Sequence, residues 1–123
     1  MGNIYKLGDI DNEQFYILPK GLFTSPKYQG ISNSARIVYA LLKDRMELSR
    51  QNGWHDDNGD IYLYFAVEEI GKLISTSRVT VIKAMKELQK VELIKTVRQG
   101  LTKPNKIYIS KLDEVYIKKE KNF

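Results

Sequence analysis

A group of hydrogen-bonding and basic side chains lies between residues 75 and 86, which we call the recognition segment. Its members are Ser75, Thr76, Ser77, Arg78, Val79, Thr80, Lys83 and Lys86. Serine and threonine hydroxyls, with the free amides of a helix start, suit phosphate oxygens. An arginine can hold the edge of a guanine with two hydrogen bonds, and a valine can contact a thymine methyl group. This chemistry is that of a surface that binds duplex DNA.

The spacing of side chains from residue 78 to residue 91 predicts a helix with two different faces. At about 100° per residue, one face collects apolar side chains. They are Val81, Ala84, Met85, Leu88 and Val91. The opposite face collects Val79, Lys83, Lys86 and Lys90. A basic face on a single helix is usually only solvated. Here the short preceding helix and the Ser-Thr-Ser turn favour a helix-turn-helix, whose second helix enters the major groove.

A second basic group surrounds the loop of a predicted β-hairpin, residues 93–110, which we call the wing. Its candidate DNA-binding residues are Arg98, Thr102, Lys103, Asn105 and Lys106. Gly100 and Pro104 shape the loop, so the lysines can reach phosphates or the minor groove. A surface hairpin that is basic by chance would have the same composition.

These groups must be positioned by a small α+β domain. The 3-and-4 spacing of apolar residues predicts a helix over 35–48, capped by Ser32 or Ser34. A turn at 56–60 should join a short strand near Trp54 to a strand over 61–65, followed by a helix over 66–74. Strands over 93–98 and 106–110 complete the pattern. The order predicts a winged helix-turn-helix over 32–110, with an N-terminal β/arm extension.

The two ends of the chain are expected to lie outside this domain. Residues 1–31 form an arm, with a β-rich run over 14–18, a possible short strand over 4–7 and a helical turn at residues 22–23. The aromatic-rich stretch 15–23 is either core packing or a self-association surface, which leaves a homodimer open. Residues 111–123 form a tail that could add one more helix, or a linker to a further domain.

Composition excludes several classes of function. Twenty basic and 15 acidic residues give a net charge of +5, which is compatible with nucleic acid. The chain has no cysteine and one histidine, His55, so we expect no catalytic residue, metal or cofactor. Counted from Asp56, an EF-hand would need glycine where Ile61 stands and glutamate where Val67 stands, so a turn is expected instead of a calcium site. No segment is apolar enough to cross a bilayer, and we expect a cytoplasmic protein with no enzymatic activity.

Several blocks of sequence together resemble the N-terminal region of RepA-type (RepA_N family) plasmid replication initiators of Gram-positive bacteria. The blocks are residues 17–23, 28–32, 35–45, 57–62 and 98–108. The resemblance implies an initiator that binds repeated sites, or iterons, in a plasmid origin, and that dimerises or binds side by side on repeats. It also implies a C-terminal domain, absent here, that engages host replication proteins. One departure is Val91-Glu92-Leu93, where relatives tend to place a glycine at the helix end.

Two other functions use the same fold. A winged-helix transcription regulator would bind one promoter operator in place of tandem origin repeats. A protein-interaction module would bind a protein partner, and its basic face would have no part in DNA affinity.

Overall fold

The computed structural model describes residues 2–113, and the possible helix in the tail lies almost entirely outside them. In chain order the elements are α1 (Gly21–Thr24), the 3-10 helix η1 (Pro26–Tyr28), α2 (Asn33–Gln51), β1 (Tyr62–Leu63), α3 (Val67–Leu73), α4 (Arg78–Lys90), β2 (Ile94–Val97) and β3 (Lys106–Ile109). This order confirms the winged helix-turn-helix that the sequence predicts.

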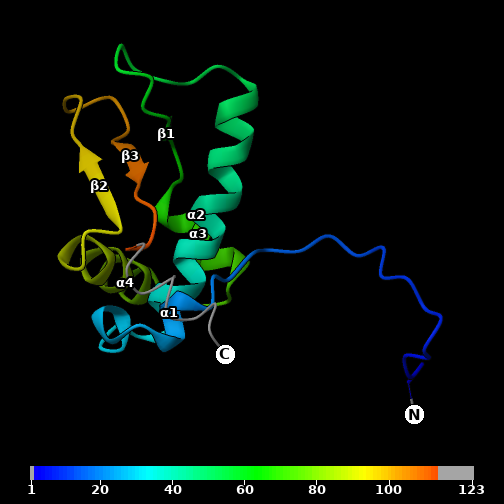
Figure 1. The fold of residues 1–123 in the computed structure, drawn as a ribbon. Helices are drawn as coiled ribbons and strands as arrows, with labels where there is room; N and C mark the ends of the chain where they lie inside the picture. The colour runs from blue at the N-terminus through cyan, green and yellow to red at the C-terminus, as the bar shows by residue number, and fades with distance from the viewer. Residues whose placement is uncertain (1, 114–123) are drawn as a thin grey trace.

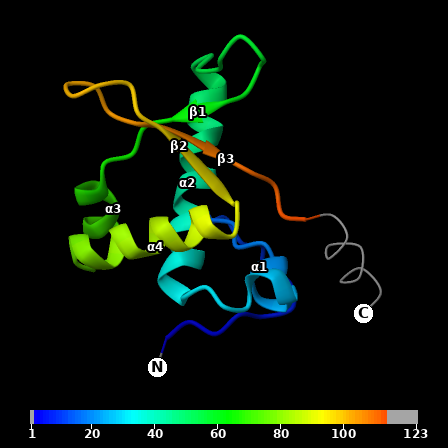
Figure 2. The same ribbon diagram turned by 90° about the vertical axis from the view of Figure 1, so that its left-hand side faces the viewer.

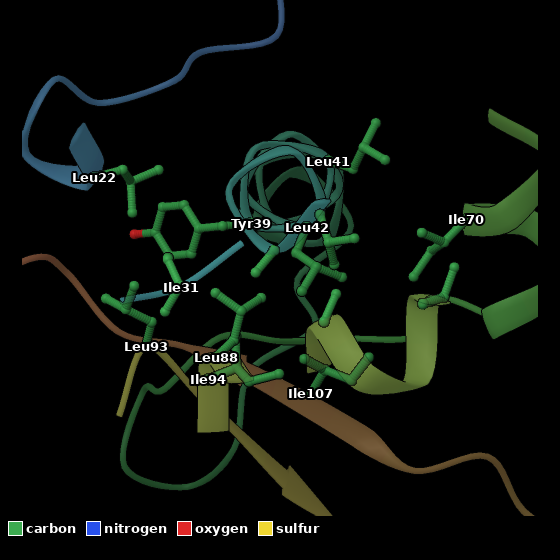
Figure 3. Close-up of a cluster of buried hydrophobic side chains, with 14 of the residues drawn as sticks. Leu22, Ile31, Tyr39, Leu41, Leu42, Ile70, Leu88, Leu93, Ile94 and Ile107 are labelled. Atoms are coloured by element: carbon green, nitrogen blue, oxygen red, sulfur yellow. The ribbon is translucent and has the colours of Figure 1, made fainter. Parts of the chain in front are cut away.

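The strands form one antiparallel sheet in the order β1-β3-β2. Helix α2 runs beside the sheet, and α4 lies across the lower end of the sheet in Figure 1. One face of the sheet turns apolar side chains toward these helices, where they meet the apolar faces of α2 and α4 (Figure 3). The labelled core comprises Leu22, Ile31, Tyr39, Leu41, Leu42, Ile70, Leu88, Leu93, Ile94 and Ile107. The apolar face expected for α4 is confirmed at its centre, since Val81, Ala84 and Leu88 are buried.

The start of α2 is fixed by a serine that also joins it to α4. Of the two candidate caps, Ser32 is the one used: its Oγ accepts a hydrogen bond from the Ala35 amide at 3.1 Å. The same hydroxyl donates to Glu87 Oε2 at 2.7 Å, and the Ser32 amide donates to Glu87 Oε1 at 2.9 Å. Because Glu87 belongs to α4, this contact fixes α4 against α2.

The C-terminal end of α4 is followed by a glutamate whose backbone conformation is uncommon for that residue type. The Leu93 amide donates to the Leu88 carbonyl at 2.9 Å and the Glu92 amide donates to the Gln89 carbonyl at 3.0 Å. This pair of bonds closes a Schellman motif, in which the residue after the cap is usually glycine. Here Glu92 takes it, with φ of 63°. The helix therefore ends where expected without the glycine.

The predicted strand over 14–18 is wrong, and so is the possible strand over 4–7. Residues 2–19 contain neither helix nor strand and extend away from the body of the protein (Figure 1). The exposed fractions of Phe15, Tyr16 and Ile17 are 61%, 55% and 65%. A β-rich run forms a strand only when another strand pairs its amides and carbonyls, and this run pairs with neither edge of the sheet. The helical turn expected at residues 22–23 is confirmed as α1.

The hairpin expected around residues 54–65 is present but shorter than predicted. Its two arms pair through a single bridge between His55 and Ile61, and β1, which follows, pairs with β3 instead. The turn at 56–60 is confirmed, and the Asp56 carboxylate holds it by accepting bonds from the Asn58 and Asp60 amides at 2.9 and 3.0 Å. These backbone hydrogen bonds lower the pKa of Asp56, and the bond from the Asp60 amide has the largest effect. This aspartate is therefore used to build a turn.

Two buried tyrosines hold the end of the sheet to the helices. Tyr39 on α2 donates its hydroxyl to the Ser110 carbonyl at 2.9 Å, and the Tyr28 hydroxyl accepts from the Asp113 amide at 3.1 Å. Burial, with a smaller contribution from Tyr28, raises the pKa of Tyr39 from 10.0 to about 12. The chain that follows the wing is thus anchored on α2 and η1.

The raised pKa of Tyr39 predicts a loss of stability in alkali. The unfolded chain releases this proton near pH 10, whereas the folded chain keeps it to about pH 12. The contribution amounts to about 2–3 kcal/mol, is complete below pH 10 and is lost as the pH rises from 10 to 12. Urea titrations at pH 9 and pH 11.5 measure this loss. Between the two pH values, the free energy of unfolding should fall by about 2 kcal/mol less in Tyr39→Phe than in the parent. Equal drops in the two proteins would contradict it.

Candidate nucleic-acid interface

The turn between α3 and α4 packs tightly on α3. The Thr76 amide donates to the Gly71 carbonyl at 2.9 Å, and Ser75 adopts φ of 54° to let the chain reverse. A Cβ added to Gly71 would lie 3.0 Å from the Thr76 carbonyl oxygen and 3.7 Å from Val81 Cγ2. The absence of a side chain at Gly71 therefore sets how closely the turn and α4 approach α3.

The recognition segment begins with a capped helix. Ser77 Oγ accepts from the Thr80 amide at 3.2 Å and lies 3.0 Å from Thr80 Oγ1. The Ser77 hydroxyl therefore bonds both the amide and the hydroxyl of Thr80, which is half-buried. Thr76 is half-buried as well, in the turn over Gly71. The other predicted members are exposed: Ser75, Ser77, Arg78, Val79, Lys83 and Lys86.

Val79 is the most exposed apolar side chain of α4, at 75%. It lies one residue after Arg78 in the first turn of α4. An apolar side chain exposed between polar and basic neighbours is suited to contact an apolar group such as a thymine methyl.

Arg78 is paired across the helix-turn-helix. Its Nη1 forms an ion pair with Glu68 Oε1 in the first turn of α3. Both side chains remain exposed, at 62% and 61%. Sequence spacing does not predict this pair, since its members lie ten positions apart on either side of a turn. The arginine expected to contact a base is thus held from one side by a carboxylate.

The wing is closed by a glutamine that sequence reasoning missed. Gln99 Nε2 donates to the Pro104 carbonyl at 2.8 Å and to the Tyr64 hydroxyl at 3.1 Å. Four of the five predicted wing residues are exposed: Arg98, Thr102, Lys103 and Asn105. The fifth, Lys106, is half-buried, with its Nζ 4.3 Å from the centre of the Tyr62 ring. Lys106 is therefore less accessible to an external anion than the four exposed members.

The recognition helix and the wing lie on one face of the protein. Figure 1 places α4 and the β2–β3 hairpin on the same side, and Figure 2 turns that side toward the viewer. In Figure 2 the wing loop and the start of α4 are at the same end of this face. Within residues 2–113, no salt bridge or side-chain hydrogen bond involves Lys83, Lys86, Arg98 or Lys103. Their charges are available to an external anion.

No group of three or more histidine, cysteine, aspartate or glutamate side chains in residues 2–113 could hold a metal ion. No helix within the same residues is long and apolar enough to cross a membrane.

Solved structures similar to this chain include three with substantial sequence identity. One is described as the N-terminal domain of a DNA binding protein, with 32% identity and a TM-score of 0.78 over 99% of this chain and 95% of that one. A second, described as a Rep–DNA complex, has 36% identity and a TM-score of 0.75 over 89% and 88% of the two chains. A third, described as an MDR initiator, has 31% identity and a TM-score of 0.73 over 98% and 99%.

Sequence comparisons agree with the structural ones. A curated relative, a "41 kDa protein" of Lactobacillus helveticus, is 32% identical over 102 residues, which cover 83% of this chain. The matched part is 29% of the relative, so the chain spans less than a third of that protein's length. The model of the family described as "Replication initiator protein A (RepA) N-terminus" matches residues 14–121. The chain therefore belongs to the RepA N-terminus (RepA_N) family.

Proposed function

We propose that this chain binds double-stranded DNA in a sequence-specific manner at repeated sites of a plasmid origin, and so serves replication initiation. The observation that carries the proposal is the single face that joins the start of α4 to the wing and displays cations that have no salt bridge or side-chain hydrogen bond within residues 2–113. The similarity to the structure described as a Rep–DNA complex supports it. Membership of the RepA N-terminus family supports the role in initiation.

We assign separate roles to the residues of this face. Arg78 and Val79, in the first turn of α4, contact base edges in the major groove. Lys83 and Lys86 lie farther along α4 and bind phosphates, as do the free amides of the helix start. In the wing, Arg98, Thr102, Lys103 and Asn105 contact phosphates or the minor groove. Lys106 contributes less, because it is partly held by the Tyr62 ring.

The division into base and phosphate contacts predicts different effects for two substitutions. Arg78→Ala should weaken binding to the preferred duplex by about 1–3 kcal/mol and relax the preference at one base pair. Lys103→Ala should weaken binding to every duplex and lower the salt dependence by about one unit of slope. The measurement is fluorescence anisotropy with a duplex that the chain selects from a random pool, with its single-base-pair substitutions, over a salt series.

Lys27→Ala is the matched control, because Lys27 is an exposed lysine on η1, which belongs neither to α4 nor to the wing. It should leave the base preference unchanged. Equal loss of affinity on selected and random duplexes in Arg78→Ala would show that Arg78 binds a phosphate. Unchanged DNA affinity in both variants would favour a protein-interaction module instead.

The choice between an origin and a promoter rests on where the selected sequence occurs. Footprints over several evenly spaced copies in a plasmid origin would support initiation. A footprint over one operator beside a promoter would support the transcription regulator that shares this fold. The family membership favours the origin.

The proposal extends to self-association and to a further domain. Residues 2–19 expose Ile4, Leu7, Ile10, Phe15 and Ile17, so the arm offers apolar surface to a second copy. Sedimentation that gives only monomer at high concentration, with and without DNA, would contradict a homodimer. Residues 111–123 would link the domain of residues 32–110 to a C-terminal domain that engages host replication proteins. The greater length of the curated relative is consistent with this arrangement.

A further inference from the structure

The ion pair between Arg78 and Glu68 joins the two helices of the helix-turn-helix at the point where α4 meets DNA in the proposed function. Glu68 lies in the first turn of α3, and Arg78 is the first residue of α4. Both side chains are about three-fifths exposed, and exposed ion pairs of this kind add little to stability. The fold is explained without this pair, because α3 and α4 already meet through Gly71, Thr76 and Val81.

The pair leaves part of the arginine free. A guanidinium has five N–H donors in a rigid plane, and the ion pair with Glu68 is made through Nη1. Within residues 2–113 the Arg78 side chain has no other hydrogen-bond or ionic partner. The edge formed by Nε and Nη2 can therefore bond two acceptors of one base while Glu68 remains bound. An arginine held in this way loses less conformational entropy on binding than a free one.

We infer that Glu68 is a positioning residue for base recognition: it holds the Arg78 guanidinium so that its free edge meets a guanine in the major groove. The inference rests on the proposed function. The Glu68 carboxylate also repels phosphates, so it opposes the use of Arg78 as a general phosphate contact. Glu68 therefore increases the difference in affinity between the preferred duplex and others, although it lowers affinity for DNA in general.

The neighbouring glutamate provides a matched control. Glu69 is on the same helix and is equally exposed, at 60%, but its partner is Arg45 Nη2 at 3.5 Å, and Arg45 belongs to α2. Glu68→Gln and Glu69→Gln each remove one negative charge from the first turn of α3. Any effect of net charge on DNA affinity is thus similar in the two variants, and their difference reports the contact with Arg78.

The experiment measures the affinity of the full chain for two duplexes. The first is the duplex that the chain selects from a random pool, and the second has the Arg78-dependent base pair replaced. The ratio of the first affinity to the second is the quantity compared. Glu68→Gln should lower this affinity ratio by about fivefold to tenfold, whereas Glu69→Gln should change it less than twofold. Both should bind random duplex more tightly than the parent chain. In an Arg78→Ala background, Glu68→Gln should leave the ratio unchanged.

The outcomes separate this inference from the proposed function. A ratio in Glu68→Gln equal to that in Glu69→Gln, with DNA binding intact, would overturn the positioning role alone. A fall in the ratio that persists in the Arg78→Ala background would show that Glu68 contacts a base itself, and would also overturn it. A parent chain without affinity for any duplex would overturn both.

Discussion

Replacing Arg36 by methionine is expected to lower the free energy of unfolding by about 3 kcal/mol, because it leaves the buried Leu22 carbonyl without a donor and takes one of two donors from the Tyr28 carbonyl, which keeps the bond from the Ile31 amide. Arg36 lies on α2 and is only 9% exposed. Its Nε donates to the Leu22 carbonyl at 2.8 Å, and its Nη2 donates to the Tyr28 carbonyl at 3.2 Å. The residue four positions after Leu22 is Pro26, which has no N–H to offer that carbonyl.

This substitution also tests how the α1–η1 segment is attached to α2. Arg36 Nη1 donates to Asn33 Oδ1 at 2.9 Å, and its guanidinium lies 5.0 Å from the centre of the Phe23 ring. Methionine keeps an unbranched apolar stem but none of these contacts.

Lys27→Met is the matched control, since it removes an exposed positive charge from the same region and should change stability by less than about 0.5 kcal/mol. Urea unfolding measures both variants. Arg36→Met as stable as Lys27→Met would contradict this account of the segment.

Replacing Gly71 by alanine is expected to destabilise the protein by about 1–3 kcal/mol and to weaken DNA binding further than the loss of folded protein explains. The added methyl carbon would lie 3.0 Å from the Thr76 carbonyl oxygen, a backbone atom that cannot rotate away. To relieve the contact, the turn must move and carry the start of α4 with it. Arg78 would then lose its position relative to Glu68 on α3. The better helix propensity of alanine offsets part of this cost.

Gly30→Ala provides the comparison for Gly71→Ala. A Cβ on Gly30 would have no atom within 4 Å, so this variant should be as stable as the parent. Urea unfolding gives the two free energies, and anisotropy at a concentration where both variants are folded gives DNA affinity. If Gly71→Ala matched Gly30→Ala in both measurements, close approach at Gly71 would not set the geometry of the helix-turn-helix.

Local patterns in the sequence were sufficient to predict the elements that carry this interface. The apolar spacing predicted α2 and α4 because each buries one face in the core, and Ser32 and Ser77 cap them as serine is suited to do. The same reasoning failed for residues 14–18, since β-forming side chains do not specify a strand without a partner. Strand formation depends on pairing that the residues themselves do not encode.

Contacts between distant residues account for what the sequence did not predict. In the sequence, Glu68 is only an acidic residue in the first turn of a predicted helix, and the fold places it beside Arg78. In the sequence, Gln99 is only a loop residue, and the fold brings it to the Pro104 carbonyl. Arg36 is one of many basic residues in the sequence, and the fold brings it to the Leu22 carbonyl. Gly71 is the exception, because a glycine inside a predicted helix often marks a close approach and so carries a signal in the sequence itself.

The central claim, that the start of α4 and the wing form one DNA-binding face, is tested most directly by NMR of the labelled chain. Amide shifts would be followed as the selected duplex is added. We expect the largest changes in residues 75–86 and 98–106, with small changes in residues 2–19 and in the turn at 56–60. The largest changes in the arm or in the turn at 56–60, with α4 unaffected, would contradict the account.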